Sequence, residues 1–334
     1  MGAKLGWIIG GLMVLVIVLV VVFAVLFPPY SEPTDSAKAG QLDIHQVPQS
    51  VATVLGAVPS EAGDAGDDYA RALELITKNS QTLEDAMGKI GEGSAIEPAA
   101  LGVFLDVDKH CAAAAKKEKM AYSAAHDLEP AEVVLYQPVV RDFVKISEAL
   151  EHLAYYQSQV EKNLPAAIET RKHHFALGYH MERERLYVTV VQEGLAIQKR
   201  ACDNRNDGTG LAQLYEAAGD KKKAQAAKDF ADAADEVLQF HEQKYAYLCK
   251  LKPNPGDVFN VAANDKDPAW RLQAILELGM IRHTAQQRGD EKYANKLIDE
   301  ILSDGSEMEK QAASAAKTVT VEELRVIGSK YLND

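Results

Sequence analysis

The apolar positions of the chain begin with one unbroken segment, Leu5 to Phe27, which contains no charged or strongly polar side chain. As a helix rising about 1.5 Å per residue, it would cover roughly 34 Å, slightly more than the hydrocarbon core of a bilayer. The segment is longer than the apolar core of a cleaved signal peptide, and it runs into Pro28 without a small-x-small cleavage pair. The pattern therefore predicts a retained single-pass transmembrane helix, a signal-anchor, with a cleaved signal peptide as the alternative.

The charges on either side of this segment predict its orientation. Lys4 precedes it, whereas Glu32 and Asp35 follow it before the first basic residue, Lys38. Basic residues close to a span tend to stay in the cytoplasm. We therefore expect residues 1–4 to form a short cytoplasmic tail in a cell membrane. The C-terminal domain is then extracytoplasmic, either periplasmic or extracellular.

Two glycines in the apolar segment are spaced for contact between helices. Gly6 and Gly10 form a small-xxx-small pattern, which lets two membrane helices approach closely. A homodimer through the anchor is one interpretation of this pair. The other is that glycine is simply frequent in membrane helices.

Residues 28–66 show no sustained period and contain five prolines and four glycines. This content prevents a long helix and predicts a flexible linker between the anchor and the rest of the chain. A short apolar stretch, Val47 to Val58, is the exception, and its alternative role is to dock against the folded domain.

From residue 67 onward the apolar positions recur at three- and four-residue steps, which predicts an all-α fold of helical hairpins resembling an α-solenoid. Prolines mark expected helix starts at Pro98, Pro130, Pro165 and Pro268. Pro138 predicts a kink or break, and the stretch from Pro165 to Cys202 predicts one unusually long helix. Thr320 and Glu323 fit a capping box that opens a last helix. We divide this part into residues 67–204, with long helices, and residues 205–334.

The second of these domains carries a family resemblance. In this domain a leucine and a small residue precede a tyrosine, a glycine follows at the turn, and two small residues come after it. These residues are Leu211, Ala212, Tyr215, Gly219, Ala224 and Ala231. This order resembles a tetratricopeptide repeat, although Lys228 and Glu236 stand where the family has an aromatic residue and a closing proline. Gly-Asp pairs at 219, 256 and 289 fall near the family's period, and residues 267–279 resemble the opening of a HEAT repeat. The resemblance covers residues 211–330. It implies a helical array that binds other proteins, and it transfers no catalytic residue.

Charge and cysteine content narrow the possible partners. The chain has a net charge of −13, and Lys4 is the only charged side chain before residue 28. Such an acidic domain is not attracted to nucleic acid or to anionic lipid head groups, because both select clustered basic residues. Cys111, Cys202 and Cys249 form no CxxC pair, and they are interpreted either as buried thiols or as one disulfide and a free cysteine.

One helix gathers the candidate metal ligands. Glu169, His173 and His180 share a face at helical spacing, close to His174 and Glu182. The spacing matches neither the Glu-x-x-His pairs of di-iron proteins nor the His-Glu-x-x-His of zinc proteases. The competing interpretation is a face that forms hydrogen bonds between helices. We predict no cofactor.

A loop at residues 203–208 partly fits a calcium loop. Asp203, Asp207 and Gly208 are in place, but Arg205 occupies a ligand position and Leu214 replaces the bidentate glutamate. A turn that ends one helix and caps the next is the alternative. The chain contains no Gly-x-Ser-x-Gly, phosphate-loop or GxGxxG motif, so hydrolase and nucleotide-binding functions lack support.

These patterns favour a membrane-tethered protein–protein interaction or scaffold protein without catalytic activity. The alternatives are an anchored metal-binding protein or enzyme that uses residues 169–182, and a structural subunit of a membrane complex. Aromatic residues in the second domain are the candidate contacts for a protein partner, because aromatic anchors dominate binding interfaces. These residues are Tyr215, Phe240, Tyr245, Tyr247 and Trp270.

Overall fold

The computed structural model describes residues 48–121, 137–184, 187–286, 291–320 and 323, all within one unit that spans Asp43–Asp334. The predicted tail, the transmembrane segment at 5–27 and most of the linker lie outside the described residues. Within the described ranges, no helix combines the length and the apolar character that crossing a membrane requires.

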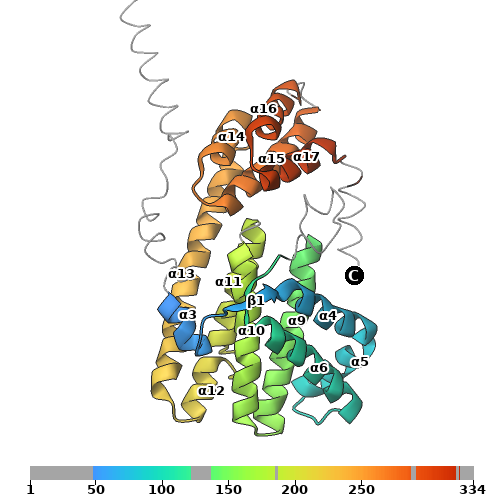
Figure 1. The fold of residues 1–334 in the computed structure, drawn as a ribbon, viewed down its shortest axis with the longest axis vertical. Coiled ribbons are helices and arrows are strands. Elements are labelled where there is room, and N and C mark those ends of the chain that lie inside the picture. Colours follow the sequence, from blue (N-terminus) through green and yellow to red (C-terminus); the bar gives the residue numbers. More distant parts are fainter. Residues whose placement is uncertain (1–47, 122–136, 185–186, 287–290, 321–322, 324–334) are drawn as a thin grey trace, which may run out of the picture. The chain divides into compact units, whose positions relative to one another are not determined.

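The predicted all-α class is confirmed for the described residues (Figure 1). In chain order the helices are α3 (Pro48–Leu55), α4 (Ala65–Lys78), α5 (Ser80–Gly91), α6 (Pro98–Ala114), α9 (Gln137–Tyr155, extended by a π turn at Tyr156–Val160), α10 (Leu164–Glu184), α11 (Val188–Cys202), α12 (Leu211–Ala217), α13 (Lys221–Leu251), α14 (Pro255–Asn264), α15 (Pro268–Gln286), α16 (Glu291–Asp304) and α17 (Glu307–Thr318).

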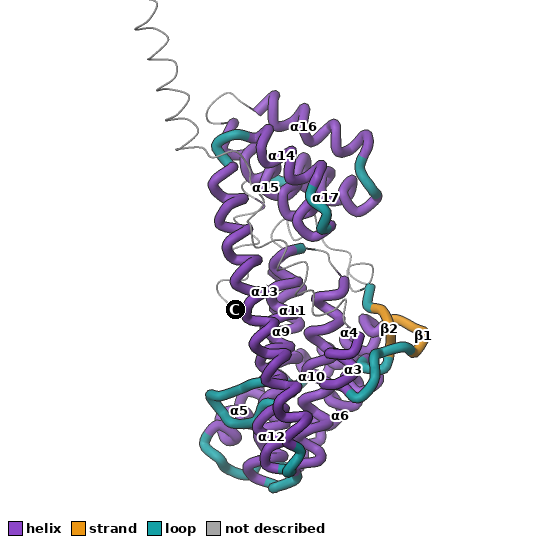
Figure 2. Tube along the Cα trace, turned by 90° about the vertical axis from the view of Figure 1, so that its left-hand side faces the viewer, coloured by secondary structure: helices purple, strands orange, loops and turns teal. Residues whose placement is uncertain are grey.

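Two short strands, β1 (Glu61–Asp64) and β2 (Lys117–Lys119), form a parallel pair beside α4 (Figure 2). Neither strand has the apolar alternation that would identify it in the sequence. Their pairing is supported by side chains instead. The Lys117 ammonium donates to the Asp64 carbonyl at 2.8 Å, and the Ala121 amide donates to the Asp64 carboxylate at 2.9 Å.

Several predicted helix boundaries are confirmed. Pro98 and Pro268 are the first residues of α6 and α15, and Pro165 is the second residue of α10. Proline is favoured there because the first turn of a helix has no hydrogen-bond acceptor for its amide. Pro138 is the second residue of α9, but Pro130 and the residues up to 136 lie outside the described part, so the predicted kink or break stays a prediction. The reciprocal hydrogen bonds of a capping box join Thr320 and Glu323.

The prediction of one long helix from Pro165 to Cys202 is wrong. The segment forms two helices, α10 and α11, which pack on each other more extensively than any other described pair. Tyr187 ends the interruption in an extended conformation, with φ −140° and ψ 153°, and caps α11. The two helices approach closely at Gly178 and Gly194. A Cβ added to Gly178 would lie only 2.4 Å from the Gly194 carbonyl oxygen, so this distance requires glycine. The two glycines mark a helix crossing within a hairpin.

Part of the segment predicted as linker is folded. Residues 48–55 form α3, which contacts α10 and α13. Val51 and Val54 point into the core and are almost completely buried. Residues 48–55 therefore dock against the folded domain, which was the alternative role of the Val47 to Val58 stretch.

The repeat pattern matches the structure at one turn and fails at the next. Gly219, with φ +82°, lies in the turn between α12 and α13, as the resemblance implies. However, α12 has 7 residues and α13 has 31, whereas the helices of a tetratricopeptide repeat are similar in length. Gly256 lies in the first turn of α14 after Pro255. The Gly-Asp pairs at 219 and 256 therefore occupy unlike places, and the third pair lies outside the described residues.

The C-terminal helices pack around α15, which contacts α14, α16 and α17. Helix α15 is buried on most sides, which explains why its apolar residues form no single stripe. Gly279 lets α17 approach, because an added Cβ would lie 2.7 Å from the Ala316 methyl group. These helices form packed hairpins, the coarse feature that the repeat resemblance implies.

Candidate functional site

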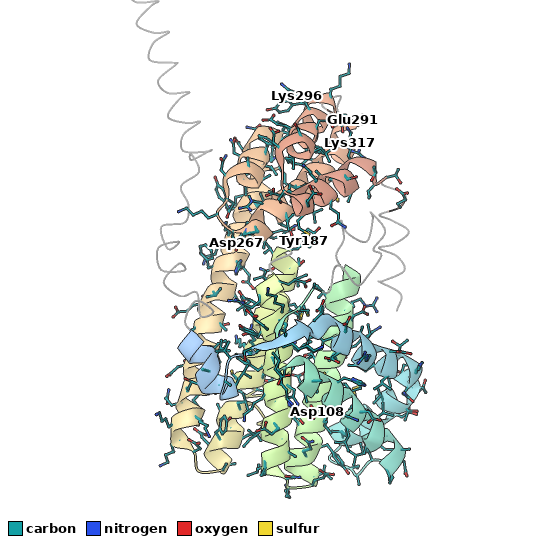
Figure 3. All side chains as sticks on the ribbon, viewed as in Figure 1. Asp108, Tyr187, Asp267, Glu291, Lys296 and Lys317 are labelled. Atoms are coloured by element: carbon teal, nitrogen blue, oxygen red, sulfur yellow. The ribbon has the colours of Figure 1, made fainter. Side chains whose placement is uncertain are left out.

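Helix α10 carries the densest set of polar side chains in the described core, and its three histidines reach three different helices. The His173 Nδ1–H donates at 2.8 Å to Asp108 of α6, a residue labelled in Figure 3. The His174 Nε2 lies 2.7 Å from the Ser147 hydroxyl of α9. The His180 Nδ1 lies 2.9 Å from the Tyr69 hydroxyl of α4. The histidines therefore connect helices and do not converge on one point.

His180 is held in one tautomer by its two partners. Its Nε2 lies 2.8 Å from the backbone carbonyl oxygen of Lys117, which can only accept, so Nε2 carries the proton. In the neutral ring Nδ1 then accepts from the Tyr69 hydroxyl. Burial lowers the pKa of His180 to about 4, although the Lys117 carbonyl and Asp64 oppose this shift. The ring is therefore neutral at pH 7.

His174 has a different pair of partners. The Arg171 guanidinium donates to its Nδ1 at 3.2 Å, so the neutral ring carries its proton on Nε2 and donates to the Ser147 hydroxyl. Burial lowers the pKa of His174 well below its ordinary value, and the positive charges of Arg171 and Arg200 lower it further. A serine next to a histidine suggests a nucleophile and base. Here an arginine occupies the place where a catalytic triad has a carboxylate, and both side chains are buried. The pair is not arranged for nucleophilic catalysis.

The predicted metal ligands are not brought together. Glu169 forms an ion pair with Lys172 at 2.7 Å on the exposed side of α10. His173 and His180 bind α6 and α4 respectively. In the part of the chain that the structure describes, no three histidine, cysteine or acidic side chains are grouped for a metal ion. The geometry of α10 corresponds to the alternative interpretation, a face that forms hydrogen bonds between helices.

The loop considered for calcium is organised around an arginine. Arg171 is fully buried and donates to the Thr209 carbonyl at 2.8 Å, to the Thr209 hydroxyl at 2.6 Å and to Asp207 at 3.1 Å. The other Asp207 oxygen accepts from the Thr209 amide at 2.8 Å. Asp203 pairs with Arg205 at 2.7 Å. A cation in this loop would have to compete with the arginines for the same carboxylates. The loop, which connects α11 to α12, is instead held to α10 through Arg171 and is not prepared for calcium.

The five candidate aromatic contacts divide into two groups. Trp270 is 1 % exposed and Tyr215 is 5 % exposed, so these two rings have almost no surface to offer a partner. Trp270 stacks on His241, with centroids 5.7 Å apart, and lies under the Lys244 ammonium at 4.8 Å. Phe240, Tyr245 and Tyr247 are half-buried along α13.

A polar connection between α13 and α15 escaped the sequence reasoning. Glu277 of α15 accepts from the Tyr245 hydroxyl at 3.1 Å and pairs with Lys252 at 2.6 Å. Lys244 pairs with Asp265, at the end of α14, at 2.7 Å. The available signal was spacing, because residues 245 and 252 lie two turns apart on one face of the helix. Tyr245, predicted as a contact for a partner, is the aromatic residue of this face.

The three thiols are free in the structure. Cys111 and Cys202 are fully buried, and this burial raises their pKa values well above the ordinary range. Buried thiols of this kind are poor nucleophiles because the thiolate is the reactive form. Cys249 on α13 is half-buried.

Comparison with protein-family models, with curated proteins and with solved structures finds no match to this chain. The fold and the contacts of α10 define its class: an all-α protein of packed helical hairpins with a buried polar network.

Proposed function

We propose that this chain is a single-pass membrane protein whose extracytoplasmic helical domain binds a protein partner near the membrane. One combination carries the proposal: an apolar segment long enough to span a bilayer, Leu5 to Phe27, precedes an all-α domain of packed hairpins. The histidines considered for chemistry on α10 are engaged in contacts between helices, which favours binding over catalysis.

In this proposal the helices from α12 to α17 present a binding surface in the manner of tetratricopeptide or HEAT repeats. Since Tyr215 and Trp270 are buried, other side chains must supply the anchors. Large apolar side chains that remain exposed on the C-terminal helices are suitable, and they include Tyr293 of α16 at 48 % and Met308 of α17 at 38 %. The half-buried Phe240 and Tyr247 extend this set. The Gly6 and Gly10 pair would let two anchors associate.

The membrane anchor is tested by charge insertion. In the full chain, replacing Val16 and Leu19 by lysine should move the protein from the membrane pellet to the supernatant after an alkaline carbonate wash, because lysine near the centre of a span is strongly unfavourable. The matched control places the two lysines in the predicted linker instead, at Ala39 and Gln46, and this variant should stay in the pellet as the wild-type protein does. Protease added outside the plasma membrane, to intact cells for an extracellular domain or to spheroplasts for a periplasmic one, should digest the domain. A wild-type protein that the wash releases, or a domain that protease cannot reach, would contradict the proposal.

Partner binding is tested at the exposed anchors. The double variant Tyr293→Ala/Met308→Ala should lose at least tenfold in recovery of proteins cross-linked to the full chain in native membranes, because truncating an anchor typically costs more than 1 kcal/mol. Lys292→Ala/Lys296→Ala, on the same exposed side of α16, is the control. Both variants should unfold at the wild-type urea concentration. Equal recovery from the two variants would remove these side chains from the interface.

A further inference from the structure

His180 is the point at which α10 meets the N-terminal elements of the folded domain. The Tyr69 hydroxyl of α4 donates to Nδ1 at 2.9 Å, and Nε2–H donates to the Lys117 carbonyl of β2 at 2.8 Å. His180 and Tyr69 are both buried, and their rings contact edge to face with centroids 5.8 Å apart. One neutral imidazole therefore joins α10 to both α4 and β2.

The charged groups around this ring are already engaged with one another. The Lys117 ammonium is 2.7 Å from the buried Asp68 carboxylate and donates to the Asp64 carbonyl. The Asp64 carboxylate accepts from the Gly66 and Ala121 amides. No carboxylate among the described residues hydrogen-bonds to the His180 ring. Other titratable groups close to His180 and its partner Tyr69 include Cys111 of α6, which influences Tyr69, and Tyr179, whose ring lies 5.7 Å from that of His180; Glu182 is buried two residues further along α10.

A proton added to His180 disrupts this arrangement in two ways. It occupies Nδ1, so the Tyr69 hydroxyl loses its acceptor and faces an N–H donor. It also places a positive charge in a buried position where neither hydrogen-bond partner of the ring is a carboxylate. The first effect acts on the contact with α4. The second acts on α4 and β2 together, because the buried charge reaches water only when α10 separates from them, even though the Lys117 carbonyl can still accept from Nε2–H.

We propose that His180 is a pH-sensitive latch, and that its protonation loosens α4 and β2 from α10. Along the chain, α3, β1 and α4 directly follow the segment that leads to the predicted anchor. Acid would therefore act first where the folded domain joins the linker. The inference rests on the contacts of the folded domain and does not depend on the proposed membrane location.

The sign and the pH range follow from proton uptake. The latched ring has a pKa of about 4, because burial disfavours the charged form, whereas an exposed histidine takes up a proton near pH 6.5. The opened form therefore gains protons first as the pH falls. The latch holds fully above about pH 6.5 and weakens progressively down to about pH 4. Between pH 7.5 and pH 5.0 the opening equilibrium should rise roughly 30-fold from this one group.

Hydrogen exchange on the full chain in detergent tests the latch. After correction for intrinsic rates, the amides of α4 and β2 should exchange roughly 30-fold faster at pH 5.0 than at pH 7.5. The amides of α15 should accelerate less between the same two pH values. In His180→Gln the amide can accept from Tyr69 and donate to Lys117 without taking up a proton. Its α4 exchange rates should therefore lose this pH dependence, whatever their absolute level.

His173→Gln is the matched control, seven residues earlier on the same helix. Because His173 contacts Asp108 of α6, this variant should keep the wild-type pH dependence in α4 and β2. A ring-proton NMR titration of His180 gives an independent measurement, and it should show no protonation of the folded protein above about pH 5. Three results would overturn the proposal: pH-independent exchange in α4, equal acceleration of all helices, or a His180 titration near pH 6.5.

Discussion

Replacing Arg171 by methionine is expected to lower the free energy of unfolding by about 3–5 kcal/mol, because removing one partner of a buried ion pair leaves the other partner uncompensated. The Arg171 guanidinium is fully buried, and burial lowers its pKa, while Asp207 and Glu151 act in the opposite direction. Methionine fills much of the same volume but donates no hydrogen bond. The Thr209 carbonyl would lose its donor, and Asp207 would keep a charge with fewer partners.

Arg205→Met is the matched control, because it removes an arginine from an ion pair in the same loop. The Arg205 side chain is 78 % exposed, and its pair with Asp203 is screened by water, so the expected loss is much smaller than that of Arg171→Met. Urea unfolding followed by circular dichroism measures both variants. Losses of similar size would show that the buried network contributes no more than a surface contact.

The sequence could predict features that depend on neighbouring residues along the chain. Proline at the start of α6 and α15, and the reciprocal capping of Thr320 and Glu323, are local arrangements of this kind. The glycine in the turn after α12 is another, because its positive φ favours glycine whatever packs around it. The all-α class followed from the same local signals.

Features that depend on distant partners could not be predicted in this way. His173 and His180 lie seven residues apart on one face, but two helical turns separate them by roughly 10 Å along the axis. Each ring therefore meets a different neighbour, and only the folded chain shows that these neighbours are Asp108 and Tyr69. Trp270 presents the same difficulty, because its residue type suits both a core and an interface. Its burial depends on His241 and Lys244 of another helix.

The hairpin of α10 and α11 was missed because its interruption contains neither glycine nor proline. The two glycines of this region lie within the helices, where sequence reasoning treats glycine as a weak helix former. Their role becomes clear from geometry alone. Gly178 and Gly194 each face the other's carbonyl oxygen, so the absence of both side chains sets the distance between the two helices.

Gly178→Ala is consequently expected to lower the free energy of unfolding by about 3 kcal/mol, at the upper end of the usual range for overpacking. The new methyl group would lie 2.4 Å from the Gly194 carbonyl oxygen and 2.9 Å from the Gln198 amide nitrogen. Both are backbone atoms that cannot rotate away, so α10 and α11 must separate along the most extensive helix packing of the domain. Thermal or urea unfolding measures the loss.

Gly102→Ala in α6 provides a control of opposite sign. A Cβ at this position meets no atom within 4 Å, so alanine brings its higher helix propensity without a clash. The expected change is a gain of about 0.5–1 kcal/mol. The two substitutions add the same methyl group to the interior of a helix, and only the neighbouring backbone differs. If Gly178→Ala were also neutral or stabilising, close contact at this crossing would not be what keeps glycine there, and the hairpin would have to tolerate a wider separation of its helices.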